Sequence, residues 1–263
     1  MSQFTLSLAQ MNIQLGDVDA NLATFRTLAE RASRNGSQAL ILPELWTTGY
    51  VLPQAADYAS TPDHGTHAAI QAVAREHQIT IIGSLLETVA DGVANSLAVI
   101  APDGTLQGIY RKVHLFRLFD EEQHLEAGYA PLVLDMPWGK TGYAICYDLR
   151  FPELFRMYCT RHNAKVLIIP AEWPAVRVDH WRSLLIARAI ENQAYVIACN
   201  SVGATGAKTF AAHSLIIDLW GKIVMEAGAT PQLLTATIDT DLTASVRATI
   251  PIFEDIRRDI YGG

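Results

Sequence analysis

Short apolar runs rich in β-branched residues alternate along this chain with longer segments whose apolar residues follow helical spacing, and this alternation limits the fold more than any other feature. Such runs, bounded by turn residues, are typical of strands. We expect strands over Phe4–Ala9, Ala39–Leu42, Thr80–Leu85, Ser96–Ile100, Gly142–Cys146, Val166–Pro170, Tyr195–Cys199, Ser214–Asp218 and Leu234–Ile238.

Between several of these strands lie segments with the spacing of amphipathic helices. In Asn21–Arg34 the apolar residues Phe25 and Leu28 recur at that spacing, and Asp17 or Asp19 can cap the start of the helix. The same spacing predicts further helices over Ala68–His77, Pro152–Arg161 and His180–Asn192.

Hairpin turn signals separate other strands, at Asp91-Gly92, Asp103-Gly104 and Trp220-Gly221. Because hairpins give antiparallel pairs and helical connections give parallel ones, we expect an α/β protein with internally mixed sheets, each covered by helices on one face. No linker or fixed-period repeat divides the 263 residues, which fit a single domain. Residues 250–263 follow as a C-terminal tail that we expect to pack on another surface.

Composition narrows the classes of partner. Charged residues make up 18% of the chain, its formal net charge is -7, and it contains no long run of Lys or Arg, so we expect neither nucleic-acid nor membrane binding. Small molecules are the expected partners. No stretch reaches the roughly 18 apolar residues of a membrane helix. Residues 1–11 lack the pattern of a secretory signal, so we expect a soluble protein.

The three cysteines are an odd number in a chain too large to need disulfides, which indicates a reducing, cytoplasmic location. They form no CxxC pair, and the eight histidines show neither HxxxH nor HExxH spacing. We therefore expect no metal and no other cofactor.

Two segments place a charged side chain beside an apolar run. Residues 41–50 lead from a strand directly into Glu44, and the flanking Leu45 and Trp46 favour partial desolvation, which raises the pKa of a carboxyl group toward the range of a general base. Residues 110–116 hold Lys112 inside an otherwise strand-like stretch, where an ammonium group can stabilise an oxyanion. Solvated surface charges are the alternative for both.

A third segment, residues 142–153, runs from a strand into Cys146, with Pro152 where a helix can begin. This order exposes a reactive side chain at a sharp corner, near backbone N–H groups that can receive an oxyanion. An inert buried thiol is the alternative, and we adopt that interpretation for Cys159 and Cys199.

Taken together, in this order and at these separations, the segments resemble the nitrilase superfamily of carbon-nitrogen hydrolases, whose Glu-Lys-Cys triad matches Glu44, Lys112 and Cys146. The resemblance covers nearly the whole chain. It implies a four-layer α-β-β-α sandwich and a homodimer formed by helices packing across a two-fold axis, with the tail crossing over. The helices over Pro152–Arg161 and His180–Asn192 are our candidates for that interface.

The family pattern also places a second glutamate between the lysine and the cysteine, seven residues before a glycine. Counting back from Gly128 selects Glu121, with the adjacent Glu122 as the alternative. The implied role is to orient the lysine. Both could instead be surface charges of a loop.

Residues 146–153 and the later residues 181–193 are most similar to the omega-amidase branch, whose members hydrolyse the terminal amide of 2-oxoglutaramate or 2-oxosuccinamate. The family's usual Ile-Asp-Pro-Trp-Gly has Leu219 in place of its proline, which changes the stiffness of a turn and not the chemistry. The alternatives are an aliphatic amidase, an N-carbamoyl amino acid hydrolase or a nitrilase with the same triad, and a catalytically idle binding protein.

A substrate with a free carboxylate requires a cation in the pocket, and an arginine can bind it bidentately. Arg150, four residues after the cysteine, is our first candidate, with a structural ion pair to Asp148 or Glu153 as the alternative. Tyr50 and Trp173 are candidate walls of the pocket, with core packing as their alternative.

Two further residues bear on how the thiol would act. The backbone N–H of Tyr147 is our candidate for the second oxyanion donor beside Lys112. His114 is the competing base, because a Cys-His pair is another way to activate a thiol, although nothing in the sequence places it beside Cys146.

Overall fold

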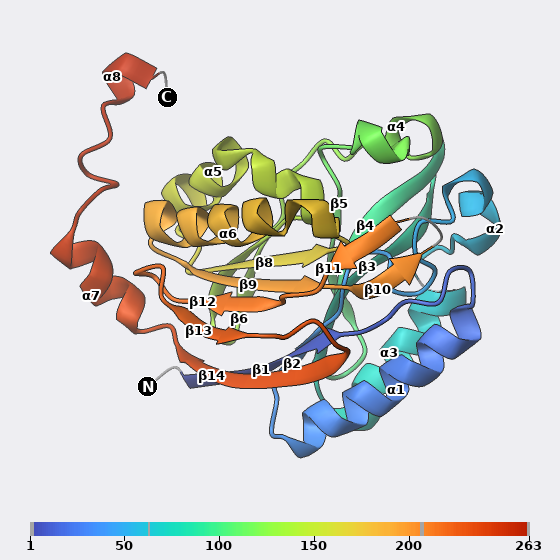
Figure 1. Cartoon of the computed structure of the whole chain (residues 1–263). Coiled ribbons are helices and arrows are strands. Elements are labelled where there is room, and N and C mark those ends of the chain that lie inside the picture. Colours follow the sequence, from blue (N-terminus) through green and yellow to red (C-terminus); the bar gives the residue numbers. More distant parts are fainter. Residues whose placement is uncertain (1–2, 63, 206–207, 262–263) are drawn as a thin grey trace.

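Two six-stranded sheets form the centre of the protein, in a computed structural model that describes residues 3–62, 64–205 and 208–261 (Figure 1). The first sheet has the strand order β14-β1-β2-β3-β4-β5, and its strands are β1 (Gln3–Gln10), β2 (Ala39–Ile41), β3 (Thr80–Val89), β4 (Gly92–Ile100), β5 (Leu106–Arg111) and β14 (Gln232–Asp239). Strand β2 runs parallel to both of its neighbours, whereas the hairpin strands β3, β4 and β5 are antiparallel.

The second sheet repeats this mixture. Its order is β13-β12-β9-β8-β7-β6, and its strands are β6 (Val133–Met136), β7 (Gly139–Tyr143), β8 (Val166–Ala171), β9 (Tyr195–Asn200), β12 (Leu215–Ile217) and β13 (Ile223–Glu226). The central strands β7, β8 and β9 are parallel, and the outer pairs are antiparallel. The prediction of internally mixed sheets is therefore confirmed.

Helices cover the outer face of each sheet (Figure 1). The first sheet carries α1 (Val18–Arg34) and α3 (Gly65–His77), and the second carries α5 (Pro152–His162) and α6 (Val178–Asn192). Asp17 is the cap of α1, since its side chain accepts a hydrogen bond from the backbone of Ala20. These four layers are the α-β-β-α sandwich expected from the resemblance.

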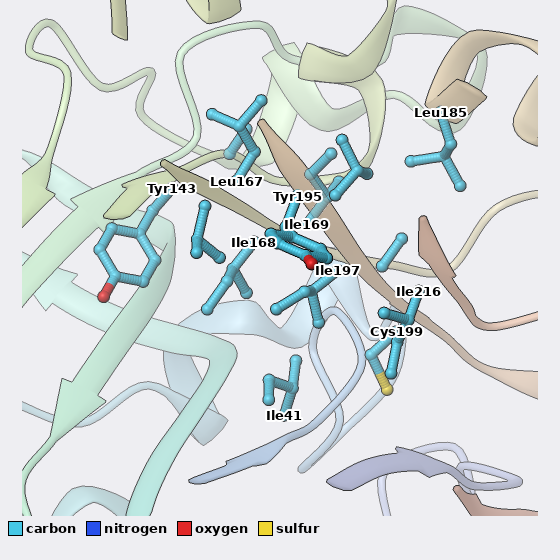
Figure 2. Packing of buried hydrophobic residues seen from close by; sticks show 14 of the residues in the cluster. Ile41, Tyr143, Leu167, Ile168, Ile169, Leu185, Tyr195, Ile197, Cys199 and Ile216 are labelled. Atoms are coloured by element: carbon cyan, nitrogen blue, oxygen red, sulfur yellow. The ribbon is translucent and has the colours of Figure 1, made fainter. Parts of the chain in front are cut away.

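The apolar core joins the two sheets to each other. Leu8 and Ile41 of the first sheet belong to the same buried cluster as Ile168 and Ile197 of the second (Figure 2). Because the inner faces of the two sheets pack against each other, residues that follow the strand ends of one sheet lie close to residues that follow the strand ends of the other.

The bounds of most predicted strands and helices lie within a few residues of the observed ones. Two predictions near the reactive residues were wrong in position. Strand β7 ends at Tyr143, so Cys146 lies in a following turn of 3-10 helix, η3 (Cys146–Arg150). Strand β5 ends at Arg111, so Lys112 comes directly after a strand and not within one.

The remaining elements are short. They are η1 (Leu52–Gln54), α2 (Ala55–Tyr58), η2 (Arg117–Phe119), α4 (Glu121–His124), η4 (Ala175–Arg177), β10 (Val202–Thr205), β11 (Lys208–Ala211), α7 (Leu242–Thr249) and α8 (Arg258–Tyr261). Within the described part of the tail, Phe253 packs under the guanidinium groups of Arg156 and Arg247, and α8 extends away from the sheets (Figure 1). Residues 262–263 of the predicted tail lie outside the described residues. No helix in the described ranges combines the length and the apolar character needed to cross a membrane.

Gly83 in β3 leaves room for the loop that follows β2, and replacing it tests that packing. A Cβ atom at position 83 would lie 2.8 Å from Leu42 Cβ and 2.9 Å from Trp46 Nε1. We expect Gly83→Ala to lower the free energy of unfolding by about 1–3 kcal/mol in urea denaturation, because a packed core cannot absorb the extra methyl group. Gly228→Ala is the control, since its nearest contact would be Gln232 Nε2 at 3.6 Å. Equal stability of the two variants would contradict the expectation.

Candidate active site

The three residues of the predicted triad converge from different strand ends. Glu44 lies in the loop after β2, and Lys112 follows β5 in the same sheet. Cys146 begins η3, beyond the end of β7 in the opposite sheet. The face-to-face packing of the sheets brings these three chain segments to one buried place.

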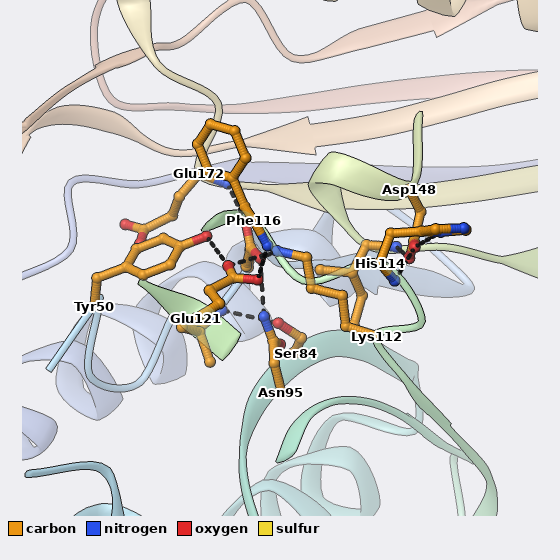
Figure 3. A network of polar contacts seen from close by, with 12 residues as sticks. Tyr50, Ser84, Asn95, Lys112, His114, Phe116, Glu121, Asp148 and Glu172 are labelled. Carbon is orange, nitrogen blue, oxygen red and sulfur yellow. Dashed lines mark hydrogen bonds and ion pairs between the residues drawn. The ribbon is translucent and has the colours of Figure 1, made fainter. Parts of the chain in front are cut away.

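Lys112 lies between two carboxylates (Figure 3). Its Nζ is 2.7 Å from Glu44 Oε1 and 2.7 Å from Glu121 Oε1, and all three side chains are completely buried. Ammonium and carboxylate groups removed from water are stable only when they are paired and hydrogen-bonded, as they are here. The arrangement fixes the ammonium group in one position.

The backbone and one amide side chain hold the Glu44 carboxylate. Asn95 Nδ2 donates to Glu44 Oε1 at 2.8 Å, and the backbone N–H of Glu172 donates to Glu44 Oε2 at 2.9 Å. Glu172 follows β8 of the second sheet, so this contact spans the two sheets. Both oxygens of Glu44 are therefore oriented before any substrate binds.

Glu121 is held in a similar way on the far side of Lys112. The backbone N–H of Phe116 donates to Glu121 Oε2 at 2.8 Å, and the Tyr50 hydroxyl donates to Glu121 Oε1 at 2.9 Å. Glu122, the alternative candidate, is exposed to solvent. Of the two glutamates, the structure places Glu121 against the lysine.

These contacts shift the pKa values of the site. Burial lowers the pKa of Lys112, but the charges of Glu121 and Glu44 outweigh it and raise that pKa, so the ammonium form persists. Burial, followed by the charge of Glu44 and a hydrogen bond to it, raises the pKa of the Cys146 thiol well above its usual value, against the opposite effect of Lys112. The resting thiol therefore keeps its proton and lies beside a carboxylate that can take it.

Cys146 has a backbone conformation that non-glycine residues rarely adopt, with φ of 45°. Such backbone strain typically costs about 1–3 kcal/mol and clusters at functional sites. It aims the side chain at a cavity lined by Phe116, Cys146, Tyr147, Arg150, Trp173, Pro174 and Arg177. The candidate pocket residues Tyr147, Arg150 and Trp173 are thus brought together with the thiol, whereas Tyr50 does not line this cavity and instead donates to Glu121.

Arg150 contacts an aromatic wall of the cavity. Its Cζ lies 4.8 Å from the centroid of the Trp173 ring, and its Nη2 lies 3.3 Å from His180 Nδ1. The alternative partner Asp148 is engaged elsewhere, because its oxygens accept hydrogen bonds from the Tyr110 hydroxyl and from the backbone of Ile145.

His114, the competing base, is also held by Asp148. Its Nδ1 lies 2.7 Å from Asp148 Oδ1, its backbone N–H donates to the same oxygen, and its ring stacks on Phe151 with centroids 3.6 Å apart. The charged groups acting on the Cys146 thiol are instead Glu44, Lys112 and Glu121. The geometry favours an architectural role for the imidazole.

Sequence reasoning did not assign three residues around this site. Asn95 is a buried amide in the middle of a strand, where this residue type is disfavoured, and that was the available signal. Glu172 follows the apolar strand β8 in the same way that Glu44 follows β2, and this position was its signal. Burial, and next the charge of Glu44, raise the pKa of Glu172 well above the usual range of a carboxyl group, which favours its neutral form. Arg177 gave no signal beyond its charge. In the described ranges no group of three or more His, Cys, Asp or Glu side chains is placed to hold a metal ion.

The chain is similar to known proteins in sequence and in structure. The family model of the carbon-nitrogen hydrolases matches residues 5–248. The chain is 40% identical to a 2-oxoglutaramate amidase of Bacillus subtilis over 260 residues, covering 98% of this chain and 100% of the relative, and 33% identical to the omega-amidase NIT2 of Mus musculus, covering 99% and 98%. A crystal structure of a CN-hydrolase superfamily protein from Xanthomonas campestris, with an arsenic adduct in its active site, superposes with a TM-score of 0.92 at 32% identity, covering 97% of this chain and 98% of that one. The chain is a member of the carbon-nitrogen hydrolase family.

Proposed function

We propose that this protein is an amidase that hydrolyses the terminal amide of a small omega-amido 2-oxo acid, 2-oxoglutaramate or 2-oxosuccinamate, to the acid and ammonia. The observation that carries the proposal is the buried contact of Lys112 with Glu44 and Glu121, beside a strained Cys146 that faces a cavity with arginine side chains. The activities for which these relatives are named support the choice of substrate.

In the first half-reaction, Glu44 takes the proton of the Cys146 thiol as the sulfur attacks the amide carbon, because the thiolate is the reactive form. The carbonyl oxygen becomes an oxyanion, and the Lys112 ammonium and the backbone N–H of Tyr147 stabilise it. A correctly aimed donor of this kind is worth about 2.7–4 kcal/mol. Glu44 returns the proton to the nitrogen, the carbon–nitrogen bond breaks, and ammonia leaves a thioester on Cys146.

In the second half-reaction, Glu44 takes a proton from water while the water oxygen attacks the thioester carbon. The second oxyanion occupies the same donors, and its collapse breaks the carbon–sulfur bond. The proton held by Glu44 returns to the sulfur, and the acid is released. One carboxylate thus serves both steps, and Glu121 keeps the Lys112 ammonium in position throughout.

The residues that line the cavity suit a substrate with a carboxylate at the end opposite the amide. Arg150 supplies a cation that can bind such a carboxylate bidentately, and Trp173 and the Tyr147 ring form apolar walls for the methylene groups. Tyr50 contributes indirectly, because its hydroxyl donates a hydrogen bond to Glu121.

A panel of amides tests the proposal. Ammonia release is measured for 2-oxoglutaramate, glutaramate, propionamide, an N-carbamoyl amino acid and a nitrile, with wild type and Cys146→Ala side by side. We expect the largest kcat/KM with 2-oxoglutaramate and no turnover by Cys146→Ala. A preference for propionamide, the carbamoyl compound or the nitrile would assign the same triad to another substrate class, because specificity depends on the pocket.

The rate at which each cysteine is alkylated distinguishes an active enzyme from a catalytically inactive binding protein of this fold. Burial raises the pKa of Cys159, to about 12, and that of Cys199, and neither residue lines the cavity. We therefore expect iodoacetamide to modify Cys146 first near neutral pH, since of the three thiols it is the one that lines the cavity and can meet the reagent. Peptide mass spectrometry over time measures this order, and equal labelling of the three cysteines would argue against a reactive site.

The proposal also takes the protein to be a cytoplasmic homodimer, folded as one domain with residues 250–263 as its tail. All three cysteines are free thiols, which supports a reducing compartment. Apolar side chains support an interface beside α6: Ile190 is 51% exposed, Trp220 is 52% exposed, and both line a groove with Ile250 and Ile256 of the tail. Size-exclusion chromatography with light scattering tests it, and a mass of one chain at micromolar concentration would contradict it.

A further inference from the structure

Arg177 is the second arginine that lines the cavity that holds Cys146. We propose that Arg177 selects 2-oxo acid amides, by donating hydrogen bonds to the 2-oxo oxygen of the substrate and by repelling the 2-ammonium group of the corresponding amino acid. The inference rests on the proposed amide hydrolysis and identifies the residue that recognises the 2-oxo group of the substrate.

The charged residues that line the cavity are both cations, whereas Glu44 and Glu121 lie behind Cys146 and are paired with Lys112. Among its seven lining residues, only Arg150 and Arg177 carry a full charge, and neither an aspartate nor a glutamate is present. In the described part of the chain, no carboxylate forms an ion pair with Arg177, which is only partly exposed. A partly buried cation without a protein anion is suited to a ligand that brings its own acceptors.

Trp173 contacts both arginines, the side chain of one and the backbone of the other. The Arg150 guanidinium lies over its ring, and its Nε1 donates to the backbone carbonyl of Arg177 at 2.8 Å. The Trp173 backbone N–H in turn donates to Asn200 Oδ1 at 2.8 Å, and the indole is 2% exposed. The Arg150 guanidinium and the Arg177 backbone are therefore held by the same buried indole.

The substrate offers two adjacent acceptors at the end far from its amide. One guanidinium fork satisfies a carboxylate bidentately, which leaves the neighbouring 2-oxo oxygen for the other. Glutaramate has the carboxylate but no 2-oxo oxygen, so Arg177 loses its acceptor. Glutamine brings an ammonium group into a cavity lined by two arginines, with no carboxylate among its lining residues to compensate the repulsion.

Three substrates of matched length test this assignment. kcat and KM are measured for 2-oxoglutaramate, glutaramate and glutamine with wild type, Arg177→Gln and Arg150→Gln. For Arg177→Gln we expect kcat/KM to fall about 10- to 100-fold with 2-oxoglutaramate and less than about threefold with glutaramate, since only the former loses a charged hydrogen bond. The ratio of kcat/KM for 2-oxoglutaramate to that for glutamine should be smaller in this variant than in wild type. Arg150→Gln, the matched control, should lower kcat/KM for 2-oxoglutaramate and glutaramate by similar factors.

Arg177→Lys covers the possibility that the neutral variant folds poorly. It keeps the positive charge, so it should still reject glutamine, but it lacks the planar fork and should lose part of the preference for 2-oxoglutaramate over glutaramate. Thermal unfolding and alkylation of Cys146 count the folded sites in each sample. Equal loss with both acids in Arg177→Gln and Arg177→Lys would overturn the assignment, whereas failure of wild type to hydrolyse either acid would overturn the proposed function.

Discussion

Glu44→Gln is expected to lower kcat/KM for the best amide of the panel by between about 10²- and 10⁴-fold, the range assigned to a general acid or base. The substitution keeps the shape of the side chain, and Lys112 keeps Glu121 as a partner. What disappears is the group that carries the thiol proton to the departing nitrogen. Steady-state ammonia release measures the loss.

Although turnover falls in Glu44→Gln, the Cys146 thiol of this variant should become easier to alkylate. The Glu44 charge raises the pKa of Cys146 and the Lys112 charge lowers it, so removing the carboxylate brings that pKa down. The pH at which iodoacetamide modifies Cys146 at half its maximal rate should therefore be lower in Glu44→Gln than in wild type. Lost turnover with retained alkylation would show that the missing function is proton transfer and not thiolate formation.

His114→Asn is the matched control for the base. Its ring is engaged by Asp148 and stacked on Phe151, outside the groups that act on the thiol. We expect its kcat/KM to remain within about tenfold of wild type, an effect below that of a lost general base. A collapse equal to that of Glu44→Gln would assign the base to the imidazole instead.

The mixed α/β class was predictable because its strands and helices carry strong local patterns, whereas the four layers were expected from the family resemblance. Val166–Ala171 and Tyr195–Asn200 are continuous apolar runs, as expected for strands buried on both faces. The end of β7 was misplaced because Ala144 and Ile145 continue the apolar run beyond the last paired residue. Burial alone does not distinguish a strand from the extended segment that follows it.

The site was predictable only in part, for a physical reason. Glu44, Lys112 and Cys146 were named from the family resemblance, which fixes residue types in order along the chain. Their supporting contacts have no such signature: Glu172 N binds Glu44 across 128 positions and Asn95 binds it across 51. Which backbone N–H or amide meets that carboxylate depends on how the two sheets pack, and no local pattern records it.

Lys112→Met is the second change with a large expected effect, and it acts on stability as well as on rate. In wild type the Glu44 and Glu121 oxygens each lie 2.7 Å from the ammonium group, with no exposure to water. Without that group, two carboxylates face each other in a medium of low dielectric constant. Removing one partner of a buried ion pair lowers the free energy of unfolding by about 3–5 kcal/mol, and we expect a loss of this size in urea denaturation.

The pH dependence of this loss follows from proton binding. The two carboxylates cannot both ionise, so one folded-state pKa in the variant lies above the unfolded value of about 4.3. The folded variant then binds more protons than the unfolded chain, and its stability, complete at low pH, falls as pH rises through the raised pKa. Lys112→Met should therefore be nearer to wild type in stability at pH 5 than at pH 8.

Two further variants identify the cause. Lys112→Met combined with Glu121→Gln removes one of the opposed carboxylates, so it should regain part of the stability and most of the pH independence. It should regain no activity, because the oxyanion donor is still missing, a loss of about 10²- to 10³-fold in kcat by itself. Lys140→Met is the control at an exposed lysine, whose Nζ lies 3.4 Å from Asp135 Oδ1, and its stability should change by less than about 0.5 kcal/mol. If Lys112→Met unfolded with the same free energy as Lys140→Met at both pH values, the buried ammonium group could not be holding Glu44 and Glu121 together.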